Sequence, residues 1–338
     1  MKQKIIVSSI IVLSLLVFYF FNKTNKVILE GMTMGTTFKI IYYCPIYKSD
    51  NNINHKIINS LNNDSKTFST YSNISEISRF NLKRTLGQIK VSSSFLELLN
   101  LSKRLYRESD GLYDPTVKPL VDLWGFGKNK KLVVPSNNII NEVRTIVGLN
   151  NIIIEEKKVR KVFKHIELDF SSSAKGLAVD NVQRILTKNK VKSYLIEIGG
   201  EISASQFKGK KDFWIVGIVD PRYKQKKEYA KINLINQSIA TSGDYQQYFK
   251  YKNKFYSHII NPKTGFPIEH KLTSVTVVAN SCAEADAYAT LLMLMSVKDG
   301  LNFTEKNENL EALFLIKSGN EIIPLKTKGF PFLALNKE

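Results

Sequence analysis

A carboxylate and a hydroxyl lie a single helical turn apart in a largely apolar segment, residues 280–295. They belong to Asp286 and Thr290, and their spacing of four residues places both oxygens on one face of a helix. Residues 283–295 are mostly Ala, Leu and Met, which favour helix. Because such a helix is expected to be buried, its carboxylate needs a partner. Carboxylate and hydroxyl oxygens suit Mg²⁺. An ion pair with an arginine, or a cap on backbone amides, is the alternative that this segment leaves open.

A second candidate segment, residues 168–176, combines a strand end, a turn of small residues and the start of a helix. The free backbone N–H groups at a helix N-terminus can bind phosphate, and small side chains let a ligand approach the backbone. Taken alone, this segment fits an ordinary serine-capped helix better than a phosphate site.

The elements that must position these residues are strands in pairs mixed with helices. Without a regular βαβ rhythm, this order predicts an α+β fold. We expect helices at 55–61, 94–109, 136–148, 174–187 and 283–295, and strands at 36–43, 151–155, 159–163, 193–198, 214–219, 255–260, 274–279, 312–316 and 321–325. We expect a loop at 66–72, a tight turn at 239–245 and a turn at 261–265.

Composition indicates a folded protein, because 43% of its 338 residues are hydrophobic and 11% are aromatic. The formal net charge of +19 could suit nucleic acid, a membrane surface or a phosphorylated substrate. The excess is mostly scattered lysine without a basic block, so a compositional bias is preferred and no nucleic-acid partner is expected. Cys44 and Cys282 form neither a disulfide framework nor a metal-binding pair.

The N-terminal 22 residues are expected to be a signal peptide or membrane anchor. Lysines precede an apolar run at 5–21, which as a helix would span about 26 Å. No small-residue cleavage site and no cysteine follows it, which favours an uncleaved anchor. We expect residues 23–30 to be a tether and residues 31–338 to form the catalytic domain. That domain is expected outside the cytoplasm, on the periplasmic face of the inner membrane or at the cell surface.

Nine short motifs occur in the order found in one family. They are Met34-Gly35-Thr36, Ser69-Thr70-Tyr71, Tyr113 to Val117, Leu123 to Phe126, Asp169 to Gly176, Gly199-Gly200-Glu201, Thr241 to Tyr245, His258 to Gly265, and Ala285-Asp286 with Thr290. Over residues 30–300 the chain thereby resembles the ApbE family of FAD:protein FMN transferases. The resemblance implies an ApbE-like fold of mixed sheets and packed helices. It also implies an exported, membrane-associated flavin transferase that uses FAD as substrate and Mg²⁺ as cofactor.

The implied reaction moves FMN from FAD to a Thr or Ser hydroxyl of an extracytoplasmic acceptor protein, such as a subunit of a membrane redox complex, and releases AMP. By similarity, Mg²⁺ is held by Asp286, Thr290 and the carbonyls of Ser172 and Ala289. Lys175 and Asp169 contact the dinucleotide, and His258 is the candidate base because imidazole titrates near neutral pH. The remaining implied FAD contacts are Met34, Tyr71, Leu112, Tyr113, Asp114 and Ile260.

Each implied residue has a plainer interpretation as well: core packing for the apolar and aromatic residues, a solvated lysine for Lys175 and a structural histidine for His258. The sequence departs from the family in having Ser171-Ser172-Ser173 where glycines are common, and in lacking a lipobox cysteine. Two other functions remain open. One is a pyrophosphatase that hydrolyses FAD to FMN and AMP, and the other is a non-catalytic FAD-binding surface protein.

Overall fold

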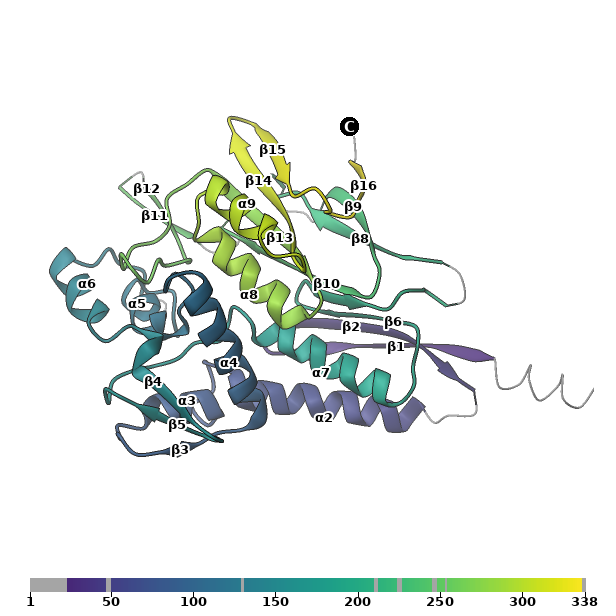
Figure 1. Cartoon of the computed structure of the whole chain (residues 1–338), viewed down its shortest axis with the longest axis horizontal. Coiled ribbons are helices and arrows are strands. Elements are labelled where there is room, and N and C mark those ends of the chain that lie inside the picture. Colours follow the sequence, from purple (N-terminus) through teal and green to yellow (C-terminus); the bar gives the residue numbers. More distant parts are fainter. Residues whose placement is uncertain are drawn as a thin grey trace, which may run out of the picture.

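An antiparallel sheet of eight strands forms the centre of the molecule (Figure 1). The computed structural model describes residues 23–46, 50–128, 131–209, 212–223, 227–244, 248–252 and 254–335. The strand order is β1-β2-β6-β7-β10-β13-β14-β15. The bounds are β1 (Thr24–Thr33), β2 (Thr36–Pro45), β6 (Tyr194–Ile198), β7 (Glu201–Ala204), β10 (Gln237–Gly243), β13 (Leu272–Ala279), β14 (Glu311–Ser318) and β15 (Glu321–Lys326).

The first hairpin corrects one expectation. Residues 23–30 are not a tether, because β1 pairs with β2 along its whole length, from Thr24 opposite Pro45 to Thr33 opposite Thr36. The connection is a two-residue turn in which both Met34 and Gly35 have positive φ, 49° and 78°. Such turns match the twist of antiparallel strands. The prediction of a tether was wrong because β1 is an edge strand. Its side chains are mostly exposed, so its sequence looks like that of a linker.

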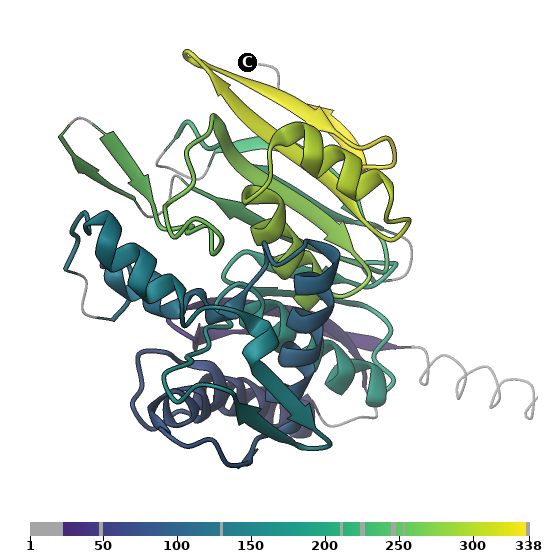
Figure 2. The ribbon, with the colours of Figure 1, turned by 60° about the vertical axis from the view of Figure 1, so that its left-hand side comes forward.

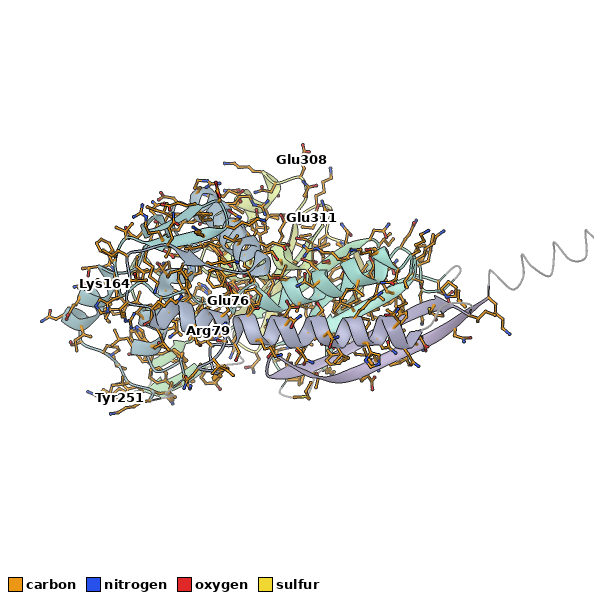
Figure 3. All side chains as sticks on the ribbon, turned by 90° about the horizontal axis from the view of Figure 1, so that it is seen from below. Glu76, Arg79, Lys164, Tyr251, Glu308 and Glu311 are labelled. Atoms are coloured by element: carbon orange, nitrogen blue, oxygen red, sulfur yellow. The ribbon has the colours of Figure 1, made fainter. Side chains whose placement is uncertain are left out.

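Helices cover one face of the sheet. They are α2 (Asp50–Phe68), α7 (Ala174–Lys188), α8 (Cys282–Met293) and α9 (Val297–Glu305). Figure 3 shows α2 running beside β1 and β2. Helices α2 and α7 share a core with β2 and β6, whereas α8 packs on β10, β13 and β14. The sheet therefore supplies a rigid base for α7 and α8, the two helices that carry the predicted metal and phosphate residues.

A three-stranded sheet packs on the opposite face of the central sheet. It has the order β16-β9-β8, with β8 (Trp214–Val219), β9 (Glu228–Leu234) and β16 (Phe332–Leu335). Alternation along β13 explains the two cores: Val277 belongs to the cluster with α8, and the next residue, Val278, belongs to the cluster with β8 and β9. Strand β13 is buried on both faces along nearly its whole length, although it contains Thr273, Ser274 and Thr276.

The remaining elements form a lobe beside the helices. It contains α3 (Glu76–Leu82), α4 (Ser93–Glu108), α5 (Lys118–Leu123), α6 (Asn137–Arg144), the short 3-10 helices η1 (Pro115–Val117) and η2 (Leu149–Asn151), and a sheet ordered β3-β5-β4. Those strands are β3 (Ile89–Lys90), β4 (Ile152–Glu155) and β5 (Lys158–Lys161). The hairpin β11 (Tyr248–Tyr251) with β12 (Lys254–Ser257) lies on the same side as α5 and α6 (Figure 2).

The mixture of antiparallel sheets and packed helices confirms the α+β prediction. Several local predictions were wrong. The expected turn at 239–245 is largely β10, a strand between β7 and β13, and Tyr245 lies outside the described residues. Helix α4 begins at Ser93 with Ser92 as its cap, one residue before the expected start, and α2 continues through Phe68 into the expected loop. Strand β12 ends at Ser257, before Ile260.

No helix within the described residues is long and apolar enough to cross a membrane. The predicted signal or anchor, residues 1–22, lies outside the part of the chain that the structure describes.

A buried carboxylate on α2 gives a testable pH dependence. Asp64 is 3% exposed, accepts a hydrogen bond from Asn181 at 2.9 Å on one oxygen, and has no hydrogen-bond partner on the other. Burial raises the pKa of Asp64 to about 6, which the Asn181 contact only partly offsets. Because this pKa is higher in the folded than in the unfolded chain, ionising Asp64 costs stability as the pH rises through that value.

We therefore expect Asp64→Asn to stabilise the protein by about 1–3 kcal/mol at pH 7.5, since the neutral amide removes the cost of a buried charge. Urea unfolding should show this gain at pH 7.5 and a smaller gain at pH 4.5. Equal free energies of unfolding for the two proteins at pH 7.5 would contradict the explanation.

Candidate functional site

A cavity of about 380 Å³ lies between the helix face and the lobe, and it collects most of the residues expected from the sequence. The expected residues that line it are Tyr71, Leu112, Tyr113, Asp114, Asp169, Ser172, Lys175, His258, Ile260, Asp286 and Thr290. Met34 and Ala289 are not among the lining residues: Met34 packs partly buried beside the cores of α2 and α4, and Ala289 is fully buried.

Asp286, in the first half of α8, and Thr290, one turn later, both line the cavity. Asp286 is 4% exposed, and its Oδ2 accepts a hydrogen bond from the backbone N–H of Gly176 at 3.1 Å. The hydroxyls of Thr290 and Ser242 are 3.1 Å apart. Helix α8 is buried almost all round, as its Ala- and Leu-rich sequence predicts, so both polar side chains are fixed by surrounding core.

Lys175 links two buried carboxylates. Its Nζ lies 2.7 Å from Glu201 Oε1 and 3.8 Å from Asp286 Oδ2. Burial would lower the pKa of Lys175, but Asp286 and Glu201 outweigh burial and raise it. Burial in turn raises the pKa of both carboxyls, and Lys175 offsets this only in part. Because two carboxyl groups face a single ammonium, this part of the cavity can accept a further positive charge.

Glu201 is a cavity residue to which sequence reasoning gave no role. Its side chain is 5% exposed, and its Oε2 has no hydrogen-bond partner although it is buried. A buried carboxylate oxygen without a partner is costly, which points to a donor or cation that binds in the cavity. The signal was present in the sequence as Gly199-Gly200-Glu201 after a buried strand, but the lysine partner lies on α7 and is not readable from the local pattern.

The serine turn before α7 forms another part of the wall. The hydroxyls of Ser172 and Tyr113 are 2.7 Å apart, and burial raises the pKa of Tyr113 to about 12. Asp169 Oδ1 accepts hydrogen bonds from the backbone N–H and hydroxyl of Ser171, at 2.8 and 2.5 Å. Asp169 therefore caps the turn that follows it through this oxygen.

Asp114 has a structural role that the sequence did not reveal. Its Oδ1 accepts from the backbone N–H and the hydroxyl of Thr116, and its Oδ2 accepts from the backbone N–H of Leu149. Since three internal donors occupy the carboxylate, Asp114 shapes the cavity wall by holding η1 and η2 together.

His258 and Ile260 follow β12 directly and line the cavity opposite α7. The His258 ring packs edge-on against Phe126, with 6.3 Å between ring centroids. Ile260 forms an isolated bridge with Pro267, which places its backbone at the wall. Tyr71 lines the mouth and is 60% exposed, so its ring is accessible to a ligand.

Several oxygen donors of the kind that bind hard cations line the cavity. Within the described ranges, no group of three or more His, Cys, Asp or Glu side chains could hold a metal ion. The site offers one carboxylate from Asp286, the hydroxyl of Thr290 and the serine turn, all on one cavity. Oxygen donors of this kind suit Mg²⁺ and not a thiolate- or imidazole-seeking metal.

Comparison with known proteins points to one family. The family model described as "ApbE family" matches residues 34–314. The FAD:protein FMN transferase of Vibrio cholerae is 36% identical over 313 residues, covering 92% of this chain and 93% of its own. That of Haemophilus influenzae is 35% identical over 328 residues, covering 94% of each chain.

Solved structures agree with the sequence relatives. The flavin transferase ApbE from Vibrio cholerae superimposes with a TM-score of 0.82 at 34% identity, covering 92% of this chain and all (100%) of that one. The apo form of the flavinyl transferase ApbE from Pseudomonas stutzeri gives a TM-score of 0.83 at 32% identity, covering 90% and 95%. The sequence motifs, the fold and these matches agree, and the chain belongs to the ApbE family.

Proposed function

We propose that this chain is a Mg²⁺-dependent FAD:protein FMN transferase that attaches FMN to a Thr or Ser hydroxyl of an acceptor protein and releases AMP. The observation that carries this proposal is the convergence of Asp286, Thr290, Ser172, Lys175 and His258 on one cavity. Relatives that cover most of the chain are named for this activity.

The cavity residues fit a bound magnesium ion. Asp286 and Thr290 would hold it with side-chain oxygens, and the Ser172 carbonyl would add a third ligand. The unpartnered Glu201 Oε2 and the excess of carboxylate over ammonium support a cation there. When bound, Mg²⁺ would neutralise charge on the diphosphate of FAD. Ala289, expected to contribute a carbonyl, does not line the cavity and carries no part of this proposal.

The chain's own residues would act mainly by position and charge. Lys175, held by Glu201, would place its ammonium beside the phosphates. Tyr71 would pack on a flat ring of the dinucleotide. His258 would accept the proton of the acceptor hydroxyl as its oxygen bonds to the FMN phosphorus. The bond from that phosphorus to the bridging oxygen would break, and AMP would leave with that oxygen.

We also propose that residues 1–22 anchor the enzyme in a membrane, with the catalytic domain and its acceptor outside the cytoplasm. The support is the apolar run at 5–21 and its flanking lysines. The acceptor would then be an extracytoplasmic flavoprotein, such as a membrane redox-complex subunit.

The test combines residues 23–338 with FAD, Mg²⁺ and purified candidate acceptors. Flavin fluorescence that stays on the acceptor in a denaturing gel, together with release of AMP, is the expected result. Free FMN and AMP without labelled acceptor would favour the pyrophosphatase. Bound FAD that remains intact would favour the non-catalytic binder.

A further inference from the structure

Helices α7 and α8 pack against each other (Figure 1). The first turn of each helix is capped by a carboxylate from the other helix. Asp180 of α7 accepts hydrogen bonds from the backbone N–H groups of Cys282 and Ala283, at 2.8 and 2.9 Å. Asp286 of α8 accepts one from Gly176 of α7 at 3.1 Å. The two helices that carry the site are therefore tied to each other in both directions.

Close backbone contact reinforces this arrangement. A Cβ built on Gly176 would lie 2.3 Å from the carbonyl oxygen of Cys282, so only glycine allows the helices to approach this far. Helix α7 receives no side-chain cap from its own N-cap residue, Ser173. The first turn of α7 thus depends on Asp286 for a cap, so the position of this turn is fixed by its contact with α8.

At the start of α8, the N-cap residue does not accept the hydrogen bonds that Asp180 accepts. The N-cap Ser281 accepts from the backbone N–H of Glu284 through its hydroxyl and from that of Ala285 through its carbonyl. This leaves the first two N–H groups, those of Cys282 and Ala283, and both go to Asp180. Asp180 is 5% exposed and does not line the cavity, so it acts through α8 and not on a ligand.

We propose that Asp180 is a positioning residue for the magnesium site: it fixes the rotation and axial position of α8 on α7, and thereby directs Asp286 and Thr290 toward Ser172 and Lys175. Asp286 lies one turn beyond Ala283, and Thr290 lies one turn further. A small rotation of α8 at its start would move both oxygens away from the serine turn. This inference rests on the proposed Mg²⁺-dependent function.

The experiment measures thermal unfolding of residues 23–338 with FAD, at increasing Mg²⁺. Ligand binding raises the melting temperature according to its affinity for the folded state. We expect Asp180→Ala to raise the Mg²⁺ concentration for half-maximal stabilisation about tenfold, the scale of one lost hydrogen bond to a charged group. Asp180→Asn, which keeps one of the two acceptors, should fall between this variant and the wild type, and it serves if the alanine variant does not fold.

Thr327→Ala is the matched control. Thr327 is 3% exposed, accepts a backbone N–H from Ala312 at 2.9 Å and does not line the cavity. This control should lower the melting temperature without Mg²⁺ but keep the wild-type Mg²⁺ dependence. If the Asp180 variants behave as Thr327→Ala does, Asp180 is merely structural and the inference is overturned. If the wild type itself shows no Mg²⁺ response, the proposed metal dependence fails, and the inference fails with it.

Discussion

Asp286→Asn is expected to lower the rate of FMN transfer by about a thousandfold or more, while the protein stays folded. Asparagine is neutral, so its amide oxygen binds a hard cation much more weakly than a carboxylate does. The fold should persist because the amide oxygen can still accept the hydrogen bond from Gly176. Burial also raises the pKa of Asp286, so removal of its charge relieves a desolvation cost. The measurement is the initial rate of acceptor labelling at saturating FAD and Mg²⁺, together with a thermal melt.

Glu284→Gln provides the control on the same helix. Glu284 lies two residues before Asp286, pairs with Arg104 of α4 and does not line the cavity. This variant should transfer FMN at close to the wild-type rate. A transfer rate for Asp286→Asn within about threefold of wild type would contradict the metal assignment, since losing even one stabilising group at a transition state usually costs far more.

His258→Ala should slow transfer by about 100- to 10,000-fold while leaving FAD affinity nearly unchanged. The reason is that a general base acts on the acceptor hydroxyl, which is not part of FAD. His258 lines the cavity and follows β12 directly. Single-turnover labelling measures the rate, and quenching of flavin fluorescence measures FAD binding. Free imidazole should restore part of the lost rate, which a purely structural histidine would not allow.

His165→Ala is the matched control, because His165 is exposed and lies away from the cavity. It should match the wild type in both measurements. Loss of FAD affinity in step with the rate of His258→Ala would instead place His258 among the groups that bind FAD, and another base would be needed.

The residues of the site that the sequence could indicate are those with a local pattern. Asp286 and Thr290 are one turn apart on an apolar helix, so their spacing marks them as a candidate pair, whereas the serine turn alone fits an ordinary capped helix better and was assigned by the family resemblance. The structure brings these two segments together as the sequence anticipated, with Gly176 bonded to Asp286. Family resemblance added His258 and Lys175, which local pattern alone assigns to ordinary roles.

What the sequence did not reveal depends on partners distant in the chain. Glu201 matters because Lys175 reaches it from α7, and Asp180 matters because α8 begins beside it. Asp114 lines the cavity as the expected FAD contact would, but its hydrogen bonds with Thr116 and Leu149 could not be foreseen from the sequence. The expected turn at 239–245 failed for a similar reason: Thr241 and Ser242 look turn-like, yet pairing with β13 makes them part of a central strand that faces the cavity.

Transfer of FMN to the hydroxyl of another protein is the reaction that we propose for the cavity with Asp286 and Lys175. The most direct measurement is mass spectrometry of an acceptor incubated with this enzyme, FAD and Mg²⁺. We expect an acceptor heavier by one FMN phosphoester on a Thr or Ser, matched by one AMP released, with neither product when Asp286 is replaced by asparagine. An unmodified acceptor beside consumed FAD, or labelling that persists in the Asp286 variant, would contradict it.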